Sequence, residues 1–339
     1  MVIFRALQVK NGDCFMLLFP DYKKPQLLII DSGFVGTFRK LEENLYQLME
    51  KYDCDIHMLL THIDQDHIGG FKSLFGKLDH SLFRHIVGFY YNTLESLKVL
   101  DPFVTKEMIS SNDVISTTTK TSYNDAMTLE TFLKEHNIPV YTGFYANGRI
   151  DFCESIFAQV LSPSQASLAK YKNWICTESE RKTAASAEDY CCSINDLAKR
   201  DFETDDNPVN ASSISFLFNA FDRKMLFLGD SLPADVAAGL RALGYSEERP
   251  LHVDLVKVSH HGSRHNTSPE LLKLIRGERF LISGQGVKGH PDKETLARII
   301  CLQEEPLLLF NYDISNDIFT PQEIKDFCIH TETQKEWRL

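Results

Sequence analysis

The sequence predicts an α/β fold in which two mixed β-sheets lie face to face with helices on both outer faces, an αββα four-layer sandwich. In each half of the chain, a strand hairpin is followed by strand-length apolar runs that alternate with segments of helical period. The chain is also suited to a large core, because 43% of its 339 residues are hydrophobic and 24% are charged. Periodicity alone does not exclude a doubly wound α/β sheet.

Strands are expected where short apolar runs lie between turn signals. The first two, residues 2–9 and 14–19, are joined through Asn11-Gly12, a dipeptide typical of hairpin turns. The other strands are expected at residues 26–30, 56–60, 85–91, 156–161, 213–219, 224–228, 255–258, 279–282 and 307–310.

Helices are expected where apolar residues recur at every third or fourth position. The helix at residues 268–275 has a clear start, because Ser268 can cap it and Pro269 suits its first position. The other helices are expected at residues 38–51, 70–78, 123–136, 234–243 and 291–301.

We expect a single domain, residues 1–339, that carries two insertions near residues 92–150 and 163–210. Within the first insertion, residues 110–122 are rich in Ser and Thr and predict a loop. The second insertion is polar, with an acidic run at residues 201–206, and is expected to be partly helical.

Charge and composition exclude several classes of protein. The 36 Lys and Arg residues against 47 Asp and Glu give a net charge of −11, which argues against broad, nonspecific binding of nucleic acid. No apolar run approaches the ~20 residues of a membrane span, and the first residues do not resemble a signal peptide. The eight cysteines are scattered without metal-site or disulfide-framework spacing. These features predict a cytoplasmic protein with reduced thiols and no membrane association.

The strongest motif is Thr-His-Ile-Asp-Gln-Asp-His-Ile-Gly-Gly at residues 61–70. It places His62, Asp64, Asp66 and His67 directly after a predicted buried strand, where α/β proteins build their sites. His62 and Asp64 are two residues apart and can point the same way, whereas the adjacent Asp66 and His67 must diverge. One short loop can therefore serve two nearby cations. A solvated acidic loop that caps the following helix is the alternative.

Asp230 ends a second apolar strand and could bridge two cations with its two carboxylate oxygens. An Asp that caps the next helix is the alternative. His260 and His261 follow a third strand, and adjacent histidines do not easily face one ion. One is expected to be a ligand and the other a substrate or supporting contact, with His260 favoured as the ligand. The turn continues with Ser263, whose backbone N–H could contact an anion.

His290 precedes Pro291 on a glycine-rich turn and is a candidate to contact a substrate oxygen or to protonate the leaving group. A histidine that simply begins a helix is the alternative.

The motif at residues 61–70 resembles the signature of the metallo-β-lactamase superfamily in a His-x-Asp-x-Asp-His form. Followed by Ile-Gly-Gly, it is similar to the hydrolase domain of ComEC-type competence proteins and their soluble relatives. The resemblance spans about residues 1–310 and implies that Asp31 supports the site and that Asp230 bridges the metals. Its other motifs, in order, are residues 11–14, 28–33, 210–213, 227–230, 258–263 and 289–291.

The chain departs from this superfamily at one ligand. The superfamily places a third His before the bridging Asp, whereas here no His occurs from residue 137 to 251 and the corresponding strand ends at Ser162. This loss, with Asp64 in place of a His, makes one metal position richer in oxygen, which favours Mn²⁺ or Mg²⁺ over Zn²⁺ there. We expect two divalent metal ions, zinc or manganese, one held tightly and one weakly. The tight set is Asp66, His67, Asp230 and His260, and the weak set is His62, Asp64 and Asp230.

The resemblance implies a metal-dependent phosphodiesterase or nuclease that acts on a phosphate-containing substrate, a nucleotide or short nucleic acid. Asp66 would orient the attacking water, and the substrate would be contacted by His261, Ser263 and His290. A hydrolase of a carbon ester, thioester or lactam is one alternative, and a non-catalytic binding module with a vestigial metal site is another. A basic rim around the site would favour phosphate; its candidates are Lys257, Arg264 and Lys288.

Overall fold

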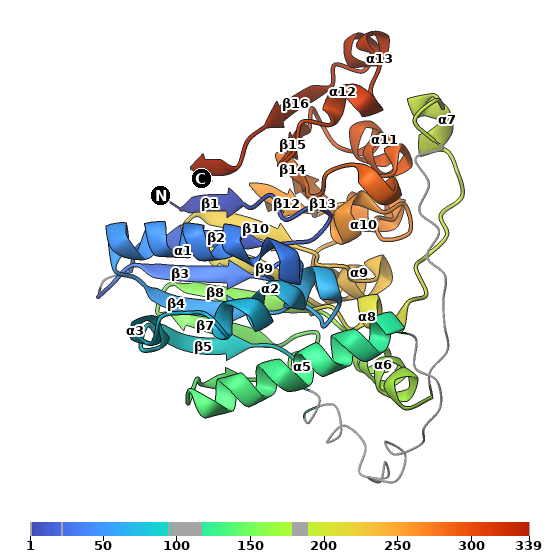
Figure 1. The fold of residues 1–339 in the computed structure, drawn as a ribbon. Coiled ribbons are helices and arrows are strands. Elements are labelled where there is room, and N and C mark those ends of the chain that lie inside the picture. The colour runs from blue at the N-terminus through green and yellow to red at the C-terminus, as the bar shows by residue number, and fades with distance from the viewer. Residues whose placement is uncertain (1, 22, 94–95, 97–116, 178–188, 339) are drawn as a thin grey trace.

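The computed structural model describes all residues except 1, 22, 94–95, 97–116, 178–188 and 339. Over these residues the chain forms the predicted four layers, with two large sheets between layers of helices (Figure 1). No helix in the described part of the chain is long and apolar enough to cross a membrane.

The first sheet has the strand order β17-β1-β2-β3-β4-β5-β6. The predicted hairpin forms its antiparallel part, and β3 to β6 run parallel. Its strands are β1 (Ile3–Ala6), β2 (Phe15–Phe19), β3 (Gln26–Ile30), β4 (Asp55–Leu59), β5 (Ile86–Tyr90), β6 (Val140–Tyr141) and β17 (Glu336–Arg338).

The second sheet has the order β16-β15-β14-β12-β10-β9-β8-β7 and is parallel from β10 to β16. A separate parallel pair joins β11 (Leu251–Val253) to β13 (Ile275–Gly277). The strands of the second sheet are β7 (Arg149–Cys153), β8 (Ile156–Ser162), β9 (Ser215–Ala220), β10 (Arg223–Phe227), β12 (Leu255–Lys257), β14 (Arg279–Ile282), β15 (Leu307–Phe310) and β16 (His330–Thr333).

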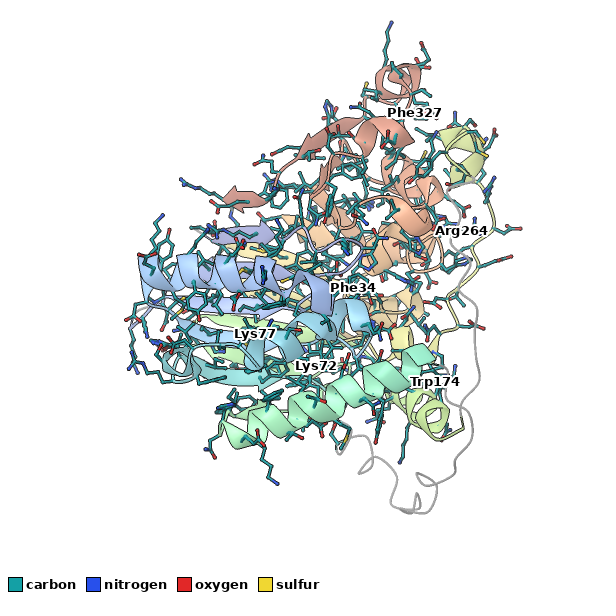
Figure 2. All side chains as sticks on the ribbon, in the orientation of Figure 1. Phe34, Lys72, Lys77, Trp174, Arg264 and Phe327 are labelled. Carbon is teal, nitrogen blue, oxygen red and sulfur yellow. The ribbon has the colours of Figure 1, made fainter. Side chains whose placement is uncertain are left out.

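Helices cover the outer face of each sheet. Those on the first sheet are α1 (Phe38–Tyr52), α2 (Gln65–Phe75), α3 (His80–Phe83), α5 (Thr117–Glu135), α6 (Gln165–Thr177) and α8 (Pro208–Ala211). Those on the second are α7 (Ile194–Ala198), α9 (Pro233–Ala242), α10 (Pro269–Lys273), α11 (Lys293–Leu302), α12 (Ser315–Ile318) and α13 (Pro321–Asp326). Lys72 on α2 forms an ion pair with Asp125 on α5 (2.6 Å), which ties these two helices together (Figure 2).

Three apolar clusters fill the three interfaces between the four layers. The central cluster joins the facing sides of the two sheets, where the rings of Phe4, Phe15 and Phe227 pack against one another. Two outer clusters join α1 and α2 to the first sheet and α9 and α11 to the second. Strands whose residues are buried on both faces, such as β2 and β3, follow from this arrangement.

Two sequence predictions need correction. Helix α2 begins at Gln65 rather than at residue 70, so Asp66 and His67 lie in its first turn and not in a loop. The predicted Ser- and Thr-rich loop at 110–122 is wrong from Thr117 onward, because α5 begins there, and residues 110–116 lie outside the described residues. The helical content expected for residues 163–210 is confirmed in α6, α7 and α8, with residues 178–188 outside the described residues.

A buried histidine on β4 makes the stability of the fold depend on pH. His57 on β4 is only 4% exposed, and its ring lies between Gln26 Oε1 (2.9 Å) and Tyr90 Oη (3.1 Å). Burial lowers the pKa of His57 from 6.5 to about 4. Because the folded chain holds this ring neutral, the unfolding free energy is complete above about pH 6.5 and falls as the pH drops toward 4. We expect His57 to account for a loss of about 2 kcal/mol at pH 5.

Urea denaturation at pH 7.5 and pH 5, with a chelator present, measures this loss. His57→Gln keeps a polar side chain beside Gln26 and Tyr90 but does not titrate, so its unfolding free energy should change less between the two pH values. Equal pH dependence in both chains would contradict the assignment.

Candidate metal centre

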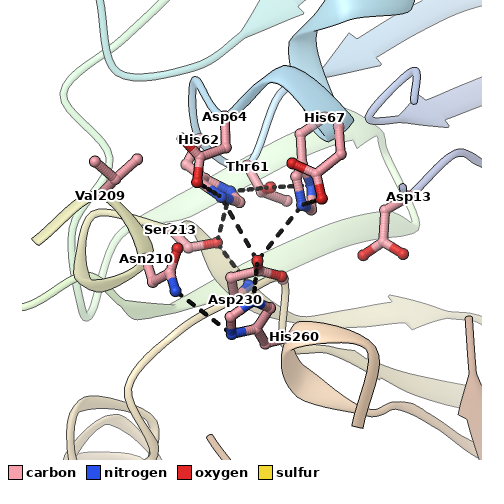
Figure 3. A network of polar contacts seen from close by, with 12 residues as sticks. Asp13, Thr61, His62, Asp64, His67, Val209, Asn210, Ser213, Asp230 and His260 are labelled. Carbon is pink, nitrogen blue, oxygen red and sulfur yellow. Dashed lines mark hydrogen bonds and ion pairs between the residues drawn. The ribbon is translucent and has the colours of Figure 1, made fainter. Parts of the chain in front are cut away.

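The predicted site residues meet where parallel strands of both sheets end. His62 and Asp64 follow β4, and Asp230 follows β10. His260 and His261 follow β12 in the short helix η3 (Ser259–Gly262). Carboxyl ends of parallel strands share one edge of a sheet, and stacking the two sheets brings these edges together (Figure 3).

Asp230 lies at the centre of the cluster. Its Oδ2 is 3.7 Å from His62 Nε2, 3.6 Å from His67 Nε2 and 3.7 Å from His260 Nε2 (Figure 3). The alternative that Asp230 caps α9 is wrong, because the N-cap of that helix is Leu232. One carboxylate thus faces three imidazoles from two segments of the chain, residues 61–70 and the short helix η3.

Two further carboxylates flank this centre. Asp64 Oδ2 lies 3.8 Å from His62 Nε2, while Asp66 Oδ2 lies 3.9 Å from His67 Nε2 and 3.4 Å from His261 Nε2. Asp64 stands at the N-cap position of α2, yet its side chain makes no capping hydrogen bond, which removes the helix-capping explanation of the motif. The donors form two groups that share Asp230.

The distances between the donor atoms suit a bound cation better than hydrogen bonds among the donors. His62 Nε2, His67 Nε2 and Asp230 Oδ1 are buried and have no hydrogen-bond partner among the described residues. Such atoms are rare because an unsatisfied buried polar group is destabilising. Separations of 3.6–3.9 Å exceed hydrogen-bond length. They approach the ~3.4 Å between two donors that each lie ~2.1 Å from one tetrahedral ion.

Burial and crowded charge set the protonation of the cluster. Burial lowers the pKa of His62 to about 3, so its ring is neutral at pH 7, the form that binds metals. Burial, followed by the negative charge of Asp66, raises the pKa of Asp64 to about 7. Burial alone would lower the pKa of His261, but Asp13 and Asp66 outweigh it and raise that pKa to about 9.

Asp31 lies behind His67, as the resemblance implies. Its Oδ2 is 2.8 Å from His67 Nδ1 and also accepts a hydrogen bond from Thr61 Oγ1 (2.8 Å), while Oδ1 accepts from the Thr61 N–H. A carboxylate on Nδ1 fixes the ring so that Nε2 faces the cluster.

Asp13 supports His261 and was missed as a site residue in the sequence. Its Oδ1 accepts from Ser283 Oγ (2.6 Å) and lies 3.4 Å from His261 Nδ1, while its Oδ2 pairs with Lys257 Nζ. One donor atom each of Asp13, His67, Asp230 and His261 lie within 4.8 Å of one another. Because both Asp13 oxygens already have partners, this residue anchors His261 rather than completing the donor set. Its signal in the sequence was its place directly after the Asn11-Gly12 turn.

The predicted basic rim is largely absent from the described residues. Lys257 is wrong as a rim residue, because it is 1% exposed and pairs with the buried Asp13. Arg264 is half-buried on the side of the molecule that carries α10 and α11 (Figure 2), and its Nε donates to His265 Nε2 (3.2 Å). The side chain of Lys288 lies outside the described residues.

The double-His turn sends its two rings in different directions. His260 and His261 both adopt left-handed conformations, with φ of 45° and 53°. These angles direct His260 Nε2 toward Asp230 and His261 Nε2 toward Asp66. The expectation was that only one ring would face the metals; the structure brings both to the cluster.

The remaining predicted contacts lie outside this donor set. His290 Nδ1 is 3.3 Å from Asp292 Oδ2, and its ring centre is 5.1 Å from that of His260. Ser263 is buried, and its N–H donates to the His260 carbonyl (2.9 Å). That backbone group is therefore engaged within the turn, contrary to the expected anion contact.

At the end of β8, where the sequence departs from the superfamily that its motifs resemble, several serines lie together. Ser162, the last residue of β8, is buried and bonds through Oγ with Ser215 Oγ (2.6 Å) and Ser231 Oγ (2.7 Å). Nearby, Ser213 Oγ accepts from the Asp230 N–H (3.0 Å) and lies 3.4 Å from His62 Nδ1. The end of β8 thus supports the site without adding an imidazole.

The chain matches no protein-family profile and no curated protein sequence. Among solved structures it is similar to the metallo-β-lactamase fold protein YhfI from Bacillus subtilis, at 10% identity over all of both chains with a TM-score of 0.43. It is also similar to Zn²⁺-bound PqqB from Methylobacterium extorquens, at 10% identity over all of both chains with a TM-score of 0.44. A third similar structure is a CmlA β-hydroxylase, at 13% identity and a TM-score of 0.44, over the whole of this chain and 54% of the other.

The observed layers and sheets are consistent with the metallo-β-lactamase fold that the sequence motifs resemble.

Proposed function

We propose that this protein is a metal-dependent hydrolase that cleaves phosphodiester bonds in a nucleotide or short nucleic acid. One observation carries the proposal: Asp230 Oδ2 lies 3.6–3.7 Å from three imidazole nitrogens, two from the motif at residues 61–70 and one from η3, and these separations exceed hydrogen-bond length. The reducing cytoplasm is the compartment proposed for this activity, on the scattered cysteines of the sequence.

The donors divide into two sets for two divalent cations, zinc or manganese. His62, Asp64 and His260 would hold one cation, and the other would be held by Asp66, His67 and His261, with Asp230 shared. This division moves His260 out of the Asp66 set expected from the sequence, because His261 Nε2 lies 3.4 Å from Asp66 Oδ2 and takes that place. Bound divalent cations supply the Lewis-acid chemistry, because they lower the pKa of water and offset negative charge that develops on a phosphoryl group.

Two side chains of this protein would act on the reacting groups. Asp66 is 25% exposed and lies at the edge of the donor cluster, so it can orient the attacking water through a hydrogen bond. His290 has a side chain that is 21% exposed; in its doubly protonated form, which Asp292 beside Nδ1 stabilises, its Nε2–H would hand a proton to the leaving oxygen and leave a neutral ring.

A phosphodiester is favoured over a carbon ester because the donors suggest two cation positions that share one carboxylate. Paired cations suit in-line displacement at phosphorus, where both the attacking and the leaving oxygen need stabilisation. The burial of Lys257 removes one expected phosphate contact and keeps hydrolysis of a carbon ester, thioester or lactam as the competing outcome.

Release of p-nitrophenol from bis(p-nitrophenyl) phosphate tests the proposal. Metal-stripped protein is reconstituted with Mn²⁺ or Zn²⁺ and compared with Asp66→Asn, for which we expect turnover to fall about 10²–10⁴-fold. Asp222→Asn is the matched control, because Asp222 has a side chain that is 85% exposed on the hairpin between β9 and β10.

The outcomes separate the alternatives. Turnover of p-nitrophenyl acetate but not of the phosphodiester, with metal bound, would replace the substrate class by carbon esters. Failure of the wild-type protein to bind either metal would overturn the hydrolase and leave a binding module with a vestigial site.

A further inference from the structure

Asn266 lies directly behind His260, between the double-His turn and α10. It is fully buried, and its Oδ1 is 3.1 Å from His260 Nδ1. Its Nδ2 donates to Asp205 Oδ2 (3.0 Å) and to the Asp230 carbonyl (3.1 Å). Two acceptors on Nδ2 fix the orientation of the amide, so the atom that faces His260 is the oxygen.

An amide oxygen accepts hydrogen bonds and does not donate them, so His260 Nδ1 must carry the proton of this contact. A neutral imidazole that is protonated at Nδ1 has its lone pair at Nε2. His260 Nε2 is the atom that lies 3.7 Å from Asp230 Oδ2. Asn266 therefore presents the ring to the cluster in its ligating form.

Asp205 holds Asn266 in place from the second predicted insertion. Its Oδ1 accepts from the Asn207 N–H (2.8 Å), and its own N–H donates to the His265 carbonyl (3.0 Å). Its Oδ2 accepts from Asn210 Nδ2 (2.7 Å) as well as from Asn266. Asn210 Nδ2 lies 3.4 Å from His260 Nδ1, farther than Asn266 Oδ1 at 3.1 Å, so the amide oxygen of Asn266 is the nearer partner of that nitrogen.

We propose that Asn266 is a positioning residue that sets the tautomer of His260, and that this makes His260 the nitrogen ligand on the His62 side. The role replaces the imidazole that the end of β8 lacks, where Ser162 is engaged with other serines. The proposal rests on the metal site of the proposed function. It adds a residue that touches neither metal nor substrate.

The first test measures the tautomer without metal or substrate. Histidine side-chain nitrogen NMR at about pH 8.5 on the metal-free wild-type protein, with His260 assigned by its loss in His260→Gln, should show the proton on Nδ1. A proton on Nε2 would overturn the proposal without any variant of Asn266. In Asn266→Ala the nearest polar group is the Asn210 amide nitrogen, a donor at 3.4 Å, and the acceptor Asp205 Oδ2 lies beyond hydrogen-bond length at 3.8 Å, so the proton should move to Nε2.

The second test measures metal affinity by titration with Mn²⁺ and with Zn²⁺. Asn266→Ala should weaken one of the two equivalents by about 10–100-fold. Asn266→Asp combined with Asp205→Asn exchanges the amide and the carboxylate, so it keeps an acceptor for His260 Nδ1 without placing two carboxylates 3.0 Å apart. This pair should restore most of the affinity, a rescue that loss of packing alone does not explain. Asn219→Ala is the matched control, because Asn219 donates within β9 to the Leu217 carbonyl (3.0 Å), away from the cluster.

Each failure has its own signature. A folded Asn266→Ala that binds both equivalents with wild-type affinity overturns the role of Asn266 and leaves the hydrolase intact. Wild-type protein that binds both metals but cleaves no phosphodiester overturns the substrate class and leaves the role of Asn266 intact.

Discussion

Asp230→Asn should abolish stoichiometric metal binding and lower phosphodiester turnover by about 10³-fold or more. Asp230 Oδ2 lies beside three imidazole nitrogens, so it is the atom that both donor sets share. An amide of the same shape keeps one neutral oxygen but loses the negative charge and the second oxygen ligand. Metal content after reconstitution, measured by elemental analysis, and bis(p-nitrophenyl) phosphate turnover check this expectation.

The control for this variant is another Asp→Asn change at a strand residue that lies away from the cluster. Asp151 on β7 has a side chain that is 60% exposed and pairs with Arg149. Asp151→Asn should retain metal and turnover. Two bound metals per chain in Asp230→Asn would show that Asp230 does not bridge the donor sets.

Lys257→Met should destabilise the metal-free protein by about 3–5 kcal/mol, because it leaves the Asp13 carboxylate buried without its cation. Both side chains are 1% exposed. Burial alone would raise the pKa of Asp13, but Lys257 and His261 hold that pKa well below its ordinary value, so the carboxylate is charged at neutral pH. Guanidinium denaturation with a chelator present measures the loss of unfolding free energy.

A second substitution distinguishes an unpaired charge from a packing defect. Asp13→Asn added to Lys257→Met removes the stranded charge, so the double variant should be more stable than the single one. Lys224→Met, at an exposed position of β10, should have little effect. A double variant that is no more stable than Lys257→Met would contradict the role of Lys257 as the partner of Asp13.

The layers of the fold were predictable because each strand corresponds to a short apolar run that can be recognised locally in the sequence. Strands such as β3 and β15 coincide with apolar runs whose ends are marked by turn residues. The start of α2 was not predictable, because Gly69 and Gly70 interrupt its helical pattern. A Cβ at either glycine would collide with the backbone near Ser32 or Val35, so these glycines serve close approach of the helix rather than flexibility. A local sequence pattern does not show which distant segments will pack closely together.

The same distinction applies to the site. The motif at residues 61–70 was recognisable because four donors lie close together in the sequence. Asp13 and Asn266 could not be assigned in the same way, because their partners are defined by the fold. Ser283, which donates to Asp13, is 270 residues away, and Asp205, which anchors Asn266, is 61 residues away. Isolated Asp, Asn and Lys residues are ordinary surface residues unless the tertiary structure buries them.

The double-His turn limits which residues the chain can accept there. Left-handed conformations are unfavourable for residues with a Cβ, by roughly 1–2 kcal/mol each, and β-branched side chains tolerate them least. The residues at positions 260 and 261 must therefore both adopt a left-handed backbone conformation and present an imidazole to the cluster. Asn or Gly would relax the backbone but remove a ring, and most other residues would lose both. Random substitution libraries of these two codons should return almost no active clones other than His-His.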